Sequence, residues 1–144
     1  MDIRPLTDSY SVTPQILPED IPAIAAAGFT TVICNRPDAE NPPEWSAEAL
    51  RPAIEAVGMA LVVNPVVGGA LTMDNVDAQR AAIDGASGKV LAYCASGNRS
   101  SIVWALANAG RMPVDDLIAP GAKYGYQVAQ FRGLIEDLDR KSVV

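Results

Sequence analysis

Three short aliphatic runs, separated by longer helical patterns, constrain the fold of this chain more than any other feature. They cover Thr31–Cys34, Leu61–Val63 and Lys89–Tyr93, and each ends in a turn of small or polar residues. Near-continuous apolar runs of this length are typical of strands that are buried on both faces. Their alternation with helices predicts an α/β fold, with a mainly parallel central sheet flanked by helices.

The whole chain, residues 1–144, is expected to form a single domain. With 144 residues, of which 49% are hydrophobic and 19% charged, the chain is long and apolar enough to bury one core. Short extended pieces are expected at 3–6 and 10–12. The patterns predict helices over 18–28, 47–57, 101–109, 114–118 and 126–138, and one from a cap at Thr72 or Asp74 to about Gly85.

In parallel sheets of this kind, ligands bind at the loops that follow the carboxyl ends of the strands. The three aliphatic runs are followed by the loops 35–38, 64–69 and 94–100. We therefore expect these loops to lie together at one edge of the sheet. Asn35, Arg36 and Asp38 become candidate substrate contacts, although Arg36 and Asp38 also fit an ordinary ion pair in a turn.

The loop after the third run carries the chemistry. Cys94 ends the strand, Gly97 allows a tight turn, and Arg99 stands where an amphipathic helix is expected to begin. Backbone N–H groups and a helix N-terminus attract anions and favour a thiolate, and Arg99 adds a permanent positive charge. We predict Cys94 as nucleophile and Arg99 as anion binder. The predicted anion-binding loop comprises Ala95, Ser96, Gly97, Asn98 and Ser100.

Simpler interpretations stand beside these. Cys94 also fits a buried core cysteine, a common fate of this residue. Cys34 has no comparable loop after it and is expected in the core, with redox pairing to Cys94 disfavoured. The hydroxyls of Ser100 and Ser101 fit either donation to a thiolate or capping of the helix. Asp74 most simply begins a helix, but it is also a candidate acid and substrate contact.

Composition excludes several kinds of function. The chain has no histidine, which removes Ser-His-Asp and Cys-His catalysis and histidine-ligated metals. Two cysteines form neither a disulfide framework nor a metal site, and we expect no metal or organic cofactor. A net charge of −6 argues against nucleic acid or an anionic membrane as partner. No apolar segment has the length of a signal peptide or a membrane span, so a cytoplasmic location is expected.

The segment Tyr93-Cys94-Ala95-Ser96-Gly97-Asn98-Arg99-Ser100 resembles the active loop of single-domain rhodaneses. From Ile3 to about Tyr126, the chain resembles the bacterial beta-lactamase-hydrolase-like family, notably in residues 31–38 and 70–76. That resemblance implies the fold of the cysteine-dependent (dual-specificity and tyrosine) phosphatases. Some members of the family stand alone, whereas others are fused to a persulfide dioxygenase domain. The resemblance therefore also implies a functional link to a persulfide dioxygenase.

Phosphatases of this fold use His-Cys-x5-Arg and an aspartic acid on another loop. Here Tyr93 precedes the cysteine, the loop to Arg99 is one residue shorter, and residues 64–69 contain no aspartate. These departures favour a sulfurtransferase. A small anionic donor, thiosulfate or a persulfide, would load Cys94 as a persulfide, and a thiol or cyanide would accept the sulfur. The alternatives are a phosphatase, with Asp74 or Asp38 as acid, and a sensor that binds an anion or persulfide without turnover.

Overall fold

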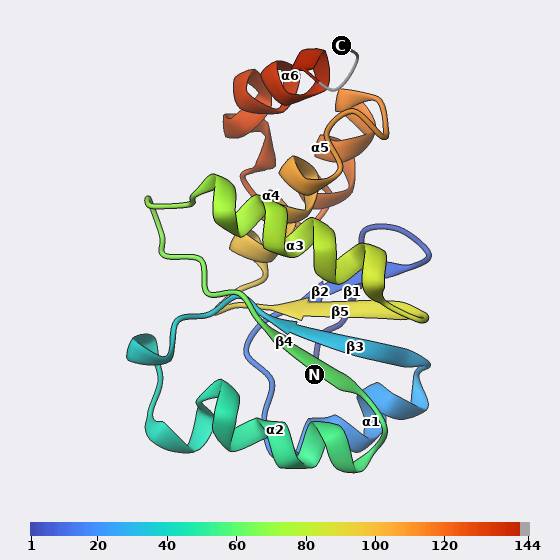
Figure 1. Ribbon diagram of the computed structural model, residues 1–144, viewed down its shortest axis with the longest axis vertical. Coiled ribbons are helices and arrows are strands. Elements are labelled where there is room, and N and C mark those ends of the chain that lie inside the picture. Colours follow the sequence, from blue (N-terminus) through green and yellow to red (C-terminus); the bar gives the residue numbers. More distant parts are fainter. Residues whose placement is uncertain (142–144) are drawn as a thin grey trace.

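A five-stranded sheet forms the centre of the computed structural model, which describes residues 1–141 (Figure 1). Its strand order is β1-β2-β5-β3-β4, with β2, β5, β3 and β4 parallel and β1 antiparallel to β2. The predicted mainly parallel sheet is thus confirmed. The strands are β1 (Arg4–Pro5), β2 (Tyr10–Thr13), β3 (Phe29–Cys34), β4 (Ala60–Val63) and β5 (Lys89–Tyr93).

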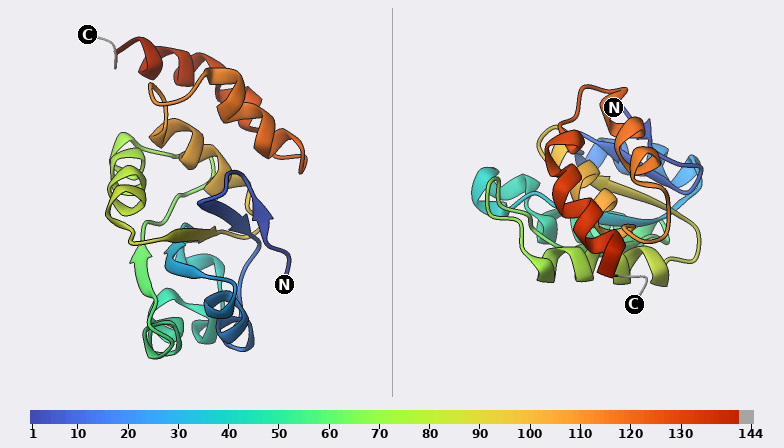
Figure 2. Two further views of the ribbon diagram at one scale, coloured as in Figure 1. Left: turned by 90° about the vertical axis from the view of Figure 1, so that its right-hand side faces the viewer. Right: turned by 90° about the horizontal axis from the view of Figure 1, so that it is seen from above.

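Helices cover both faces of the sheet. Figure 1 shows α1 and α2 on one face and α3 and α4 on the other, and Figure 2 shows α5 and α6 on the outer side of α4. Among the described residues, no helix is both long and apolar enough to cross a bilayer. The α-helices are α1 (Ile21–Ala26), α2 (Ala47–Ala56), α3 (Met73–Gly85), α4 (Asn98–Ala107), α5 (Val114–Ala122) and α6 (Arg132–Lys141). Short 3₁₀ helices are η1 (Pro18–Asp20), η2 (Asp38–Glu40), η3 (Pro43–Trp45) and η4 (Val128–Phe131).

Local sequence explains where several helices begin and end. The Ser46 hydroxyl accepts the Ala49 N–H and caps α2, which explains why the helix predicted from residue 47 begins there. Of the two predicted caps for α3, Thr72 is the one used, since its hydroxyl accepts the Asn75 N–H. After α1 the chain turns at Gly28, whose φ of 95° lies in the left-handed region that glycine adopts at little cost.

Other predicted boundaries were wrong. The helix expected from residue 101 begins three residues earlier, because the turn at Gly97 leads directly into Asn98. The helix expected over 114–118 continues through Pro120, and its last turn buries Gly121 against the core. The pattern at 126–138 divides into η4 and then α6, and the pattern from Pro18 divides into η1 and α1.

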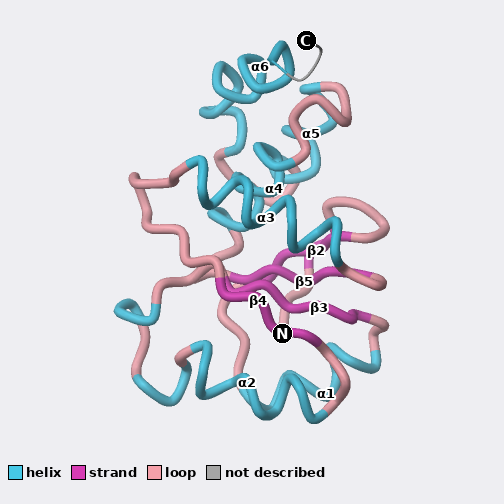
Figure 3. Tube along the Cα trace, in the orientation of Figure 1, coloured by secondary structure: helices cyan, strands magenta, loops and turns pink. Residues whose placement is uncertain are grey.

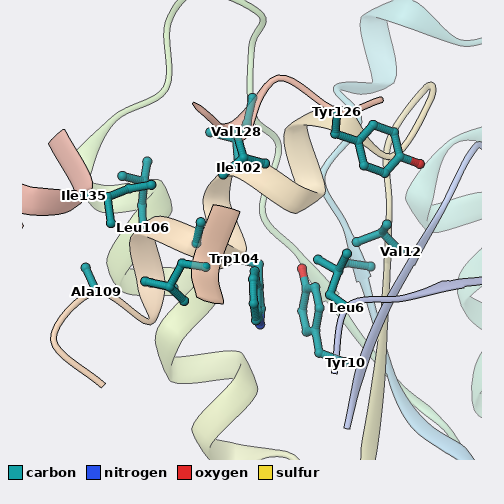
Figure 4. Packing of buried hydrophobic residues seen from close by; sticks show 14 of the residues in the cluster. Leu6, Tyr10, Val12, Ile102, Trp104, Leu106, Ala109, Tyr126, Val128 and Ile135 are labelled. Carbon is teal, nitrogen blue, oxygen red and sulfur yellow. The ribbon is translucent and has the colours of Figure 1, made fainter. Parts of the chain in front are cut away.

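Two hydrophobic clusters lie on opposite faces of the sheet, and β5 contributes to both. Val90 and Ala92 face the cluster under α3–α6, whereas Leu91 and Tyr93 face the cluster under α1 and α2. The helix α4 was expected to be amphipathic but is buried from Ser100 to Ala107, because α3, α5 and α6 surround it. In Figure 4 its Trp104 ring lies along the Tyr10 ring, with centroids 5.8 Å apart.

Candidate active site

Cys94 follows β5, the middle strand of the sheet, and is fully buried. The Gly97 N–H donates to the Cys94 Sγ at 3.0 Å. Gly97 has a φ of 98°, in the left-handed region that glycine adopts at little cost. Because α4 begins at the next residue, its N-terminus lies at the same place. A backbone donor and a helix N-terminus both stabilise negative charge near Sγ.

The predicted meeting of three loops is confirmed by hydrogen bonds between them. Arg99 Nη1 donates to the Val66 carbonyl oxygen at 2.9 Å, and the Asn35 amide donates to the Asn64 carbonyl oxygen at 2.9 Å. The loops leave the sheet at the same edge, on the left in Figure 3. The parallel strands therefore bring together residues that lie far apart in the sequence.

The serine hydroxyls serve neither of the roles expected of them. Ser100 Oγ donates to Asn35 Oδ1 at 2.9 Å, and Ser101 Oγ donates to the Gly97 carbonyl oxygen at 2.8 Å. Both hydroxyls therefore brace the loop instead of donating to Cys94 or capping α4. The backbone amide of Ser100 lies in the first turn of α4, where the helix itself offers no acceptor. The predicted role of Ser100 in binding an anion therefore rests on its backbone amide and stays a prediction.

Tyr126 and Gln127 form hydrogen bonds to the rest of the predicted anion-binding loop. Ala95 and Ser96 are exposed, and the Tyr126 hydroxyl donates to the Ser96 carbonyl oxygen at 2.8 Å. Asn98 Oδ1 accepts the backbone N–H of Gln127 at 2.9 Å. The segment after α5 therefore fixes the shape of the loop. Nothing in the local sequence indicates that Tyr126 contacts a loop some thirty residues away.

Arg99 is oriented by a carboxylate that the sequence analysis did not select. Its Nη1 and Nη2 donate to the two carboxylate oxygens of Glu40, at 2.7 and 2.8 Å. The pKa of Arg99 lies above its ordinary value, chiefly because of these hydrogen bonds, and Cys94 adds to the same direction. Glu40 thus fixes the orientation of the guanidinium, and the role of Arg99 in binding an anion stays a prediction.

Glu40 binds a second arginine as well. Arg36 Nε lies 3.4 Å from Glu40 Oε1, and Arg36 Nη1 donates to Gln15 Oε1 at 3.2 Å. Hydrogen bonding to Arg99, with the charge of Arg36, holds the pKa of the Glu40 carboxyl below its ordinary value. Glu40 is therefore ionised at neutral pH. A carboxylate four residues after Arg36 was the only sequence feature that could have indicated this pairing.

The two aspartates proposed as acids have other positions. Asp38 does not pair with Arg36, since its Oδ1 accepts the Ala47 N–H at 3.0 Å, at the start of α2. Asp74 is exposed in the first turn of α3, which agrees with its simpler interpretation. Neither residue has a hydrogen bond that connects it to the Cys94 loop in the described part of the chain, and their contact with a substrate stays a prediction.

Beneath the loop lies a buried network of uncharged polar side chains. The Gln79 Oε1 accepts from the amides of Asn35 and Asn64 at 2.9 Å each, and the Gln79 amide donates to the Tyr10 hydroxyl at 2.9 Å. The Tyr10 hydroxyl in turn donates to the Ser100 carbonyl oxygen at 3.0 Å. Asn35 is fully buried in this network. It was predicted as a substrate contact, and its observed contacts instead support the loop.

Cys34 is buried in the core of the α1–α2 face, as expected. Its thiol donates to the Arg36 carbonyl oxygen at 3.4 Å, and burial raises its pKa above the ordinary value. Cys34 and Cys94 are both free cysteines. Within residues 1–141, no group of three or more cysteines, aspartates or glutamates is arranged to hold a metal ion.

Comparison with known proteins identifies the family. The model of the family described as "Beta-lactamase hydrolase-like protein, phosphatase-like domain" matches residues 2–111. The chain belongs to this family. Two beta-lactamase hydrolase-like proteins match it: one from Xylella fastidiosa (strain Temecula1), 29% identical over 132 residues, and one from Agrobacterium fabrum (strain C58), 28% identical over 125 residues. These matches cover 90% and 85% of this chain but only 31% and 29% of those proteins. The chain spans about a third of the length of the curated relatives it matches.

Solved structures agree with the assignment to the beta-lactamase hydrolase-like family. A Neisseria meningitidis protein, described as a candidate phosphatase, is 31% identical, with a TM-score of 0.79 over 96% of this chain and 99% of that one. The active form of Tk-PTP (18% identical, TM-score 0.74, covering 96% of each chain) and PTPMT1 (12%, 0.74, covering 99% of each) share the fold. The phosphatase-like fold implied by the sequence resemblance is thus confirmed.

Proposed function

We propose that this phosphatase-like domain transfers sulfur, with Cys94 as the sulfur-carrying nucleophile. One observation carries the proposal: Glu40, the carboxylate bound to Arg99, is held in its ionised form, because Arg99 lowers its pKa. Hydrolysis of a phosphate ester needs a protonated acid to assist the leaving oxygen. Asp38 and Asp74 are placed at helix starts instead. Sulfur transfer to a cysteine needs no such acid when the leaving group is a stable anion.

The two half-reactions balance without a cofactor. The Cys94 thiolate attacks the outer sulfur of thiosulfate, the S–S bond of the donor breaks, and sulfite leaves with the electron pair. The product is a Cys94 persulfide anion. A thiolate or cyanide then attacks the outer sulfur of this persulfide and returns the electron pair to Cys94 Sγ. The N–H of Gly97 and the guanidinium of Arg99 would stabilise the anions at both stages.

Hydrolysis of a phosphate ester is the second candidate, and the comparisons favour it. The family description names a phosphatase-like domain, and the named structural neighbours include PTPMT1 and Tk-PTP. None of the relatives cited above is described as a sulfurtransferase. A thiolate held by backbone amides and an arginine would suit a phosphoryl group as well. The observations that favour sulfur transfer are the ionised Glu40 and the Cys-x4-Arg spacing, one residue shorter than the Cys-x5-Arg pattern described above.

Mass spectrometry separates the two. Incubation with thiosulfate should add one sulfur atom to the intact protein and nothing to Cys94→Ser, and cyanide should remove it. Arg99→Ala should strongly lower the rate of sulfur loading while changing the free energy of unfolding only slightly. If no adduct forms and p-nitrophenyl phosphate is hydrolysed in a Cys94-dependent way, the sulfurtransferase proposal is wrong. An adduct that passes to no acceptor would indicate a sensor.

A persulfide dioxygenase is the proposed functional partner. Transfer of sulfur to a low-molecular-weight thiol produces a thiol persulfide, which is the kind of compound that such a dioxygenase oxidises. This link rests on the family resemblance stated above and on the proposed reaction. It predicts that mixing the sulfur-loaded protein, a thiol and a persulfide dioxygenase leads to oxygen uptake that Cys94→Ser does not support.

A further inference from the structure

A cleft of about 260 Å³ opens beside the Cys94 loop. Its walls come from the 64–72 segment, the start of α4 and η4. The apolar lining includes Val66, Val67, Leu71 and Phe131. Arg99 also lines it, and the same residue carries an electrostatic interaction with Cys94. The cleft therefore adjoins the group that is to hold the reacting anion.

The charge of the cleft limits what it can bind. Among the described residues that line it, Arg99 is the only charged one, and Glu40 already pairs with that guanidinium. The polar side chains at the η4 wall, Gln127 and Gln130, are uncharged. An ammonium group placed in this cleft would lose water without gaining a partner of opposite charge. A carboxylate on the acceptor would compete with Glu40 and with the reacting sulfur for the guanidinium of Arg99, so an uncharged organic part suits the apolar lining better.

We propose that this cleft binds the carbon skeleton of the sulfur acceptor, a low-molecular-weight thiol whose organic part is uncharged and mainly apolar. The proposal rests on the proposed sulfur transfer and deepens it by naming the class of the second substrate. Thiosulfate is small and fully anionic and has no group for such a cleft. The cleft therefore serves the second half-reaction, in which the acceptor thiolate reaches the outer sulfur of the Cys94 persulfide.

The same step defines the chemistry of the acceptor. Its thiol loses a proton to solvent, its sulfur forms a new S–S bond with the outer persulfide sulfur, and the bond from that sulfur to Cys94 Sγ breaks. The electron pair returns to Sγ as a thiolate. Apolar groups on Val67 and Leu71 would exclude water from the organic part, while Gln130 offers hydrogen bonds to an amide or hydroxyl. Specificity thus comes from shape and absence of charge.

Acceptor selectivity provides the first test. The protein is loaded with thiosulfate, and the loss of sulfur is followed with benzyl mercaptan, glutathione and cyanide, each rate being corrected for the concentration of reactive anion. Benzyl mercaptan should react faster than the charged glutathione. Val67→Asp and Gln130→Glu, both at exposed positions, should slow benzyl mercaptan about tenfold, a typical effect of a mismatched group in an apolar pocket. Loading by thiosulfate and transfer to cyanide should fall less than transfer to benzyl mercaptan, because the added charge repels every anion but only the organic acceptor occupies the cleft. Val57→Asp is the matched control, since Val57 is exposed outside the cleft.

A binding measurement separates failure of this proposal from failure of sulfur transfer. Benzyl methyl sulfide cannot accept sulfur, and its binding is measured by ligand-observed NMR on the wild type and on the three variants. Binding that Val67→Asp and Gln130→Glu abolish, in a protein that thiosulfate never loads, would support the cleft and overturn sulfur transfer. Normal loading, with no binding and equal rates in all variants, would overturn the cleft. Faster transfer to glutathione than to benzyl mercaptan would overturn it as well.

Discussion

Gly97→Ala perturbs the Cys94 loop at its tightest point. Gly97 has a φ of 98°, and a Cβ added there would lie 2.2 Å from the Tyr126 Oη and 2.8 Å from its Cζ. No pair of such atoms can be this close, so the Tyr126 ring must move or the loop must change. Movement of the ring breaks the hydrogen bond from Tyr126 to the Ser96 carbonyl oxygen and the one it receives from Arg4.

The expected cost follows from two contributions. An alanine held at this positive φ costs about 1–2 kcal/mol in backbone strain. Each hydrogen bond lost from Tyr126 costs about 1 kcal/mol. We therefore expect Gly97→Ala to lower the free energy of unfolding by about 3–4 kcal/mol. It should also slow sulfur loading, because the shifted backbone moves the Gly97 N–H away from Cys94 Sγ.

Two further variants isolate these contributions, with urea unfolding as the assay. Gly58 has a similar φ of 84° and nothing within 4 Å of an added Cβ, so Gly58→Ala reports the backbone strain alone. In a Tyr126→Phe background both hydrogen bonds of the hydroxyl are already absent, so Gly97→Ala should cost about 2 kcal/mol less than in the wild type. The reasoning is refuted if Gly97→Ala costs no more than Gly58→Ala, or if its cost is the same with Phe at position 126.

Three other predictions concern the surroundings of the loop. In the folded protein the pKa of Glu40 lies below its ordinary value of 4.5, so its ion pair stabilises the fold above that pH and is lost as the pH falls through the folded pKa. The difference in free energy of unfolding between wild type and Glu40→Gln, measured by urea unfolding, should therefore be smaller at pH 3 than at pH 7. An unchanged difference would contradict the pairing of Glu40 with Arg99. Gln79→Leu leaves two buried amides without their acceptor and should cost about 2–4 kcal/mol in the same assay, whereas a loss below about 1 kcal/mol would contradict the network. Cys34→Ala should still gain one sulfur atom from thiosulfate by intact mass, since burial keeps Cys34 a thiol, and loss of the adduct would assign sulfur transfer to Cys34 as well as Cys94.

Much of the scaffold could be predicted from the sequence, because burial leaves a direct pattern. The runs that end at Cys34, Val63 and Tyr93 form parallel strands, and the loops after them lie at one edge of the sheet, as expected. Caps at Ser46 and Thr72 act where their spacing suggests. Strand order and helix boundaries were not accessible in the same way. They depend on packing partners, as when the core buries the turn of α5 that follows its proline.

Only the part of the site that is contiguous in the sequence could be predicted. Cys94, Gly97 and Arg99 lie close together in the sequence, at the turn of one strand–turn–helix unit, so their proximity follows from local sequence, whereas their roles stay predictions. Glu40 and Tyr126 reach the same loop from distant segments, and each lies in a stretch with no distinctive local pattern. The ion pair between Glu40 and Arg99 is a tertiary contact, and no local pattern in the sequence indicates it. The same holds for the asparagines and glutamine beneath the loop.

The contact between Glu40 and Arg99 links the geometry of the site to the type of reaction. A carboxylate can orient an arginine strongly only while it is ionised, because the two short hydrogen bonds are charge-assisted. An acid catalyst must instead carry a proton until the leaving group departs. Glu40 therefore cannot perform both tasks at neutral pH, and its lowered pKa assigns it to orientation. A site arranged in this way suits leaving groups that depart as stable anions, as sulfite does, better than alkoxides that need a proton.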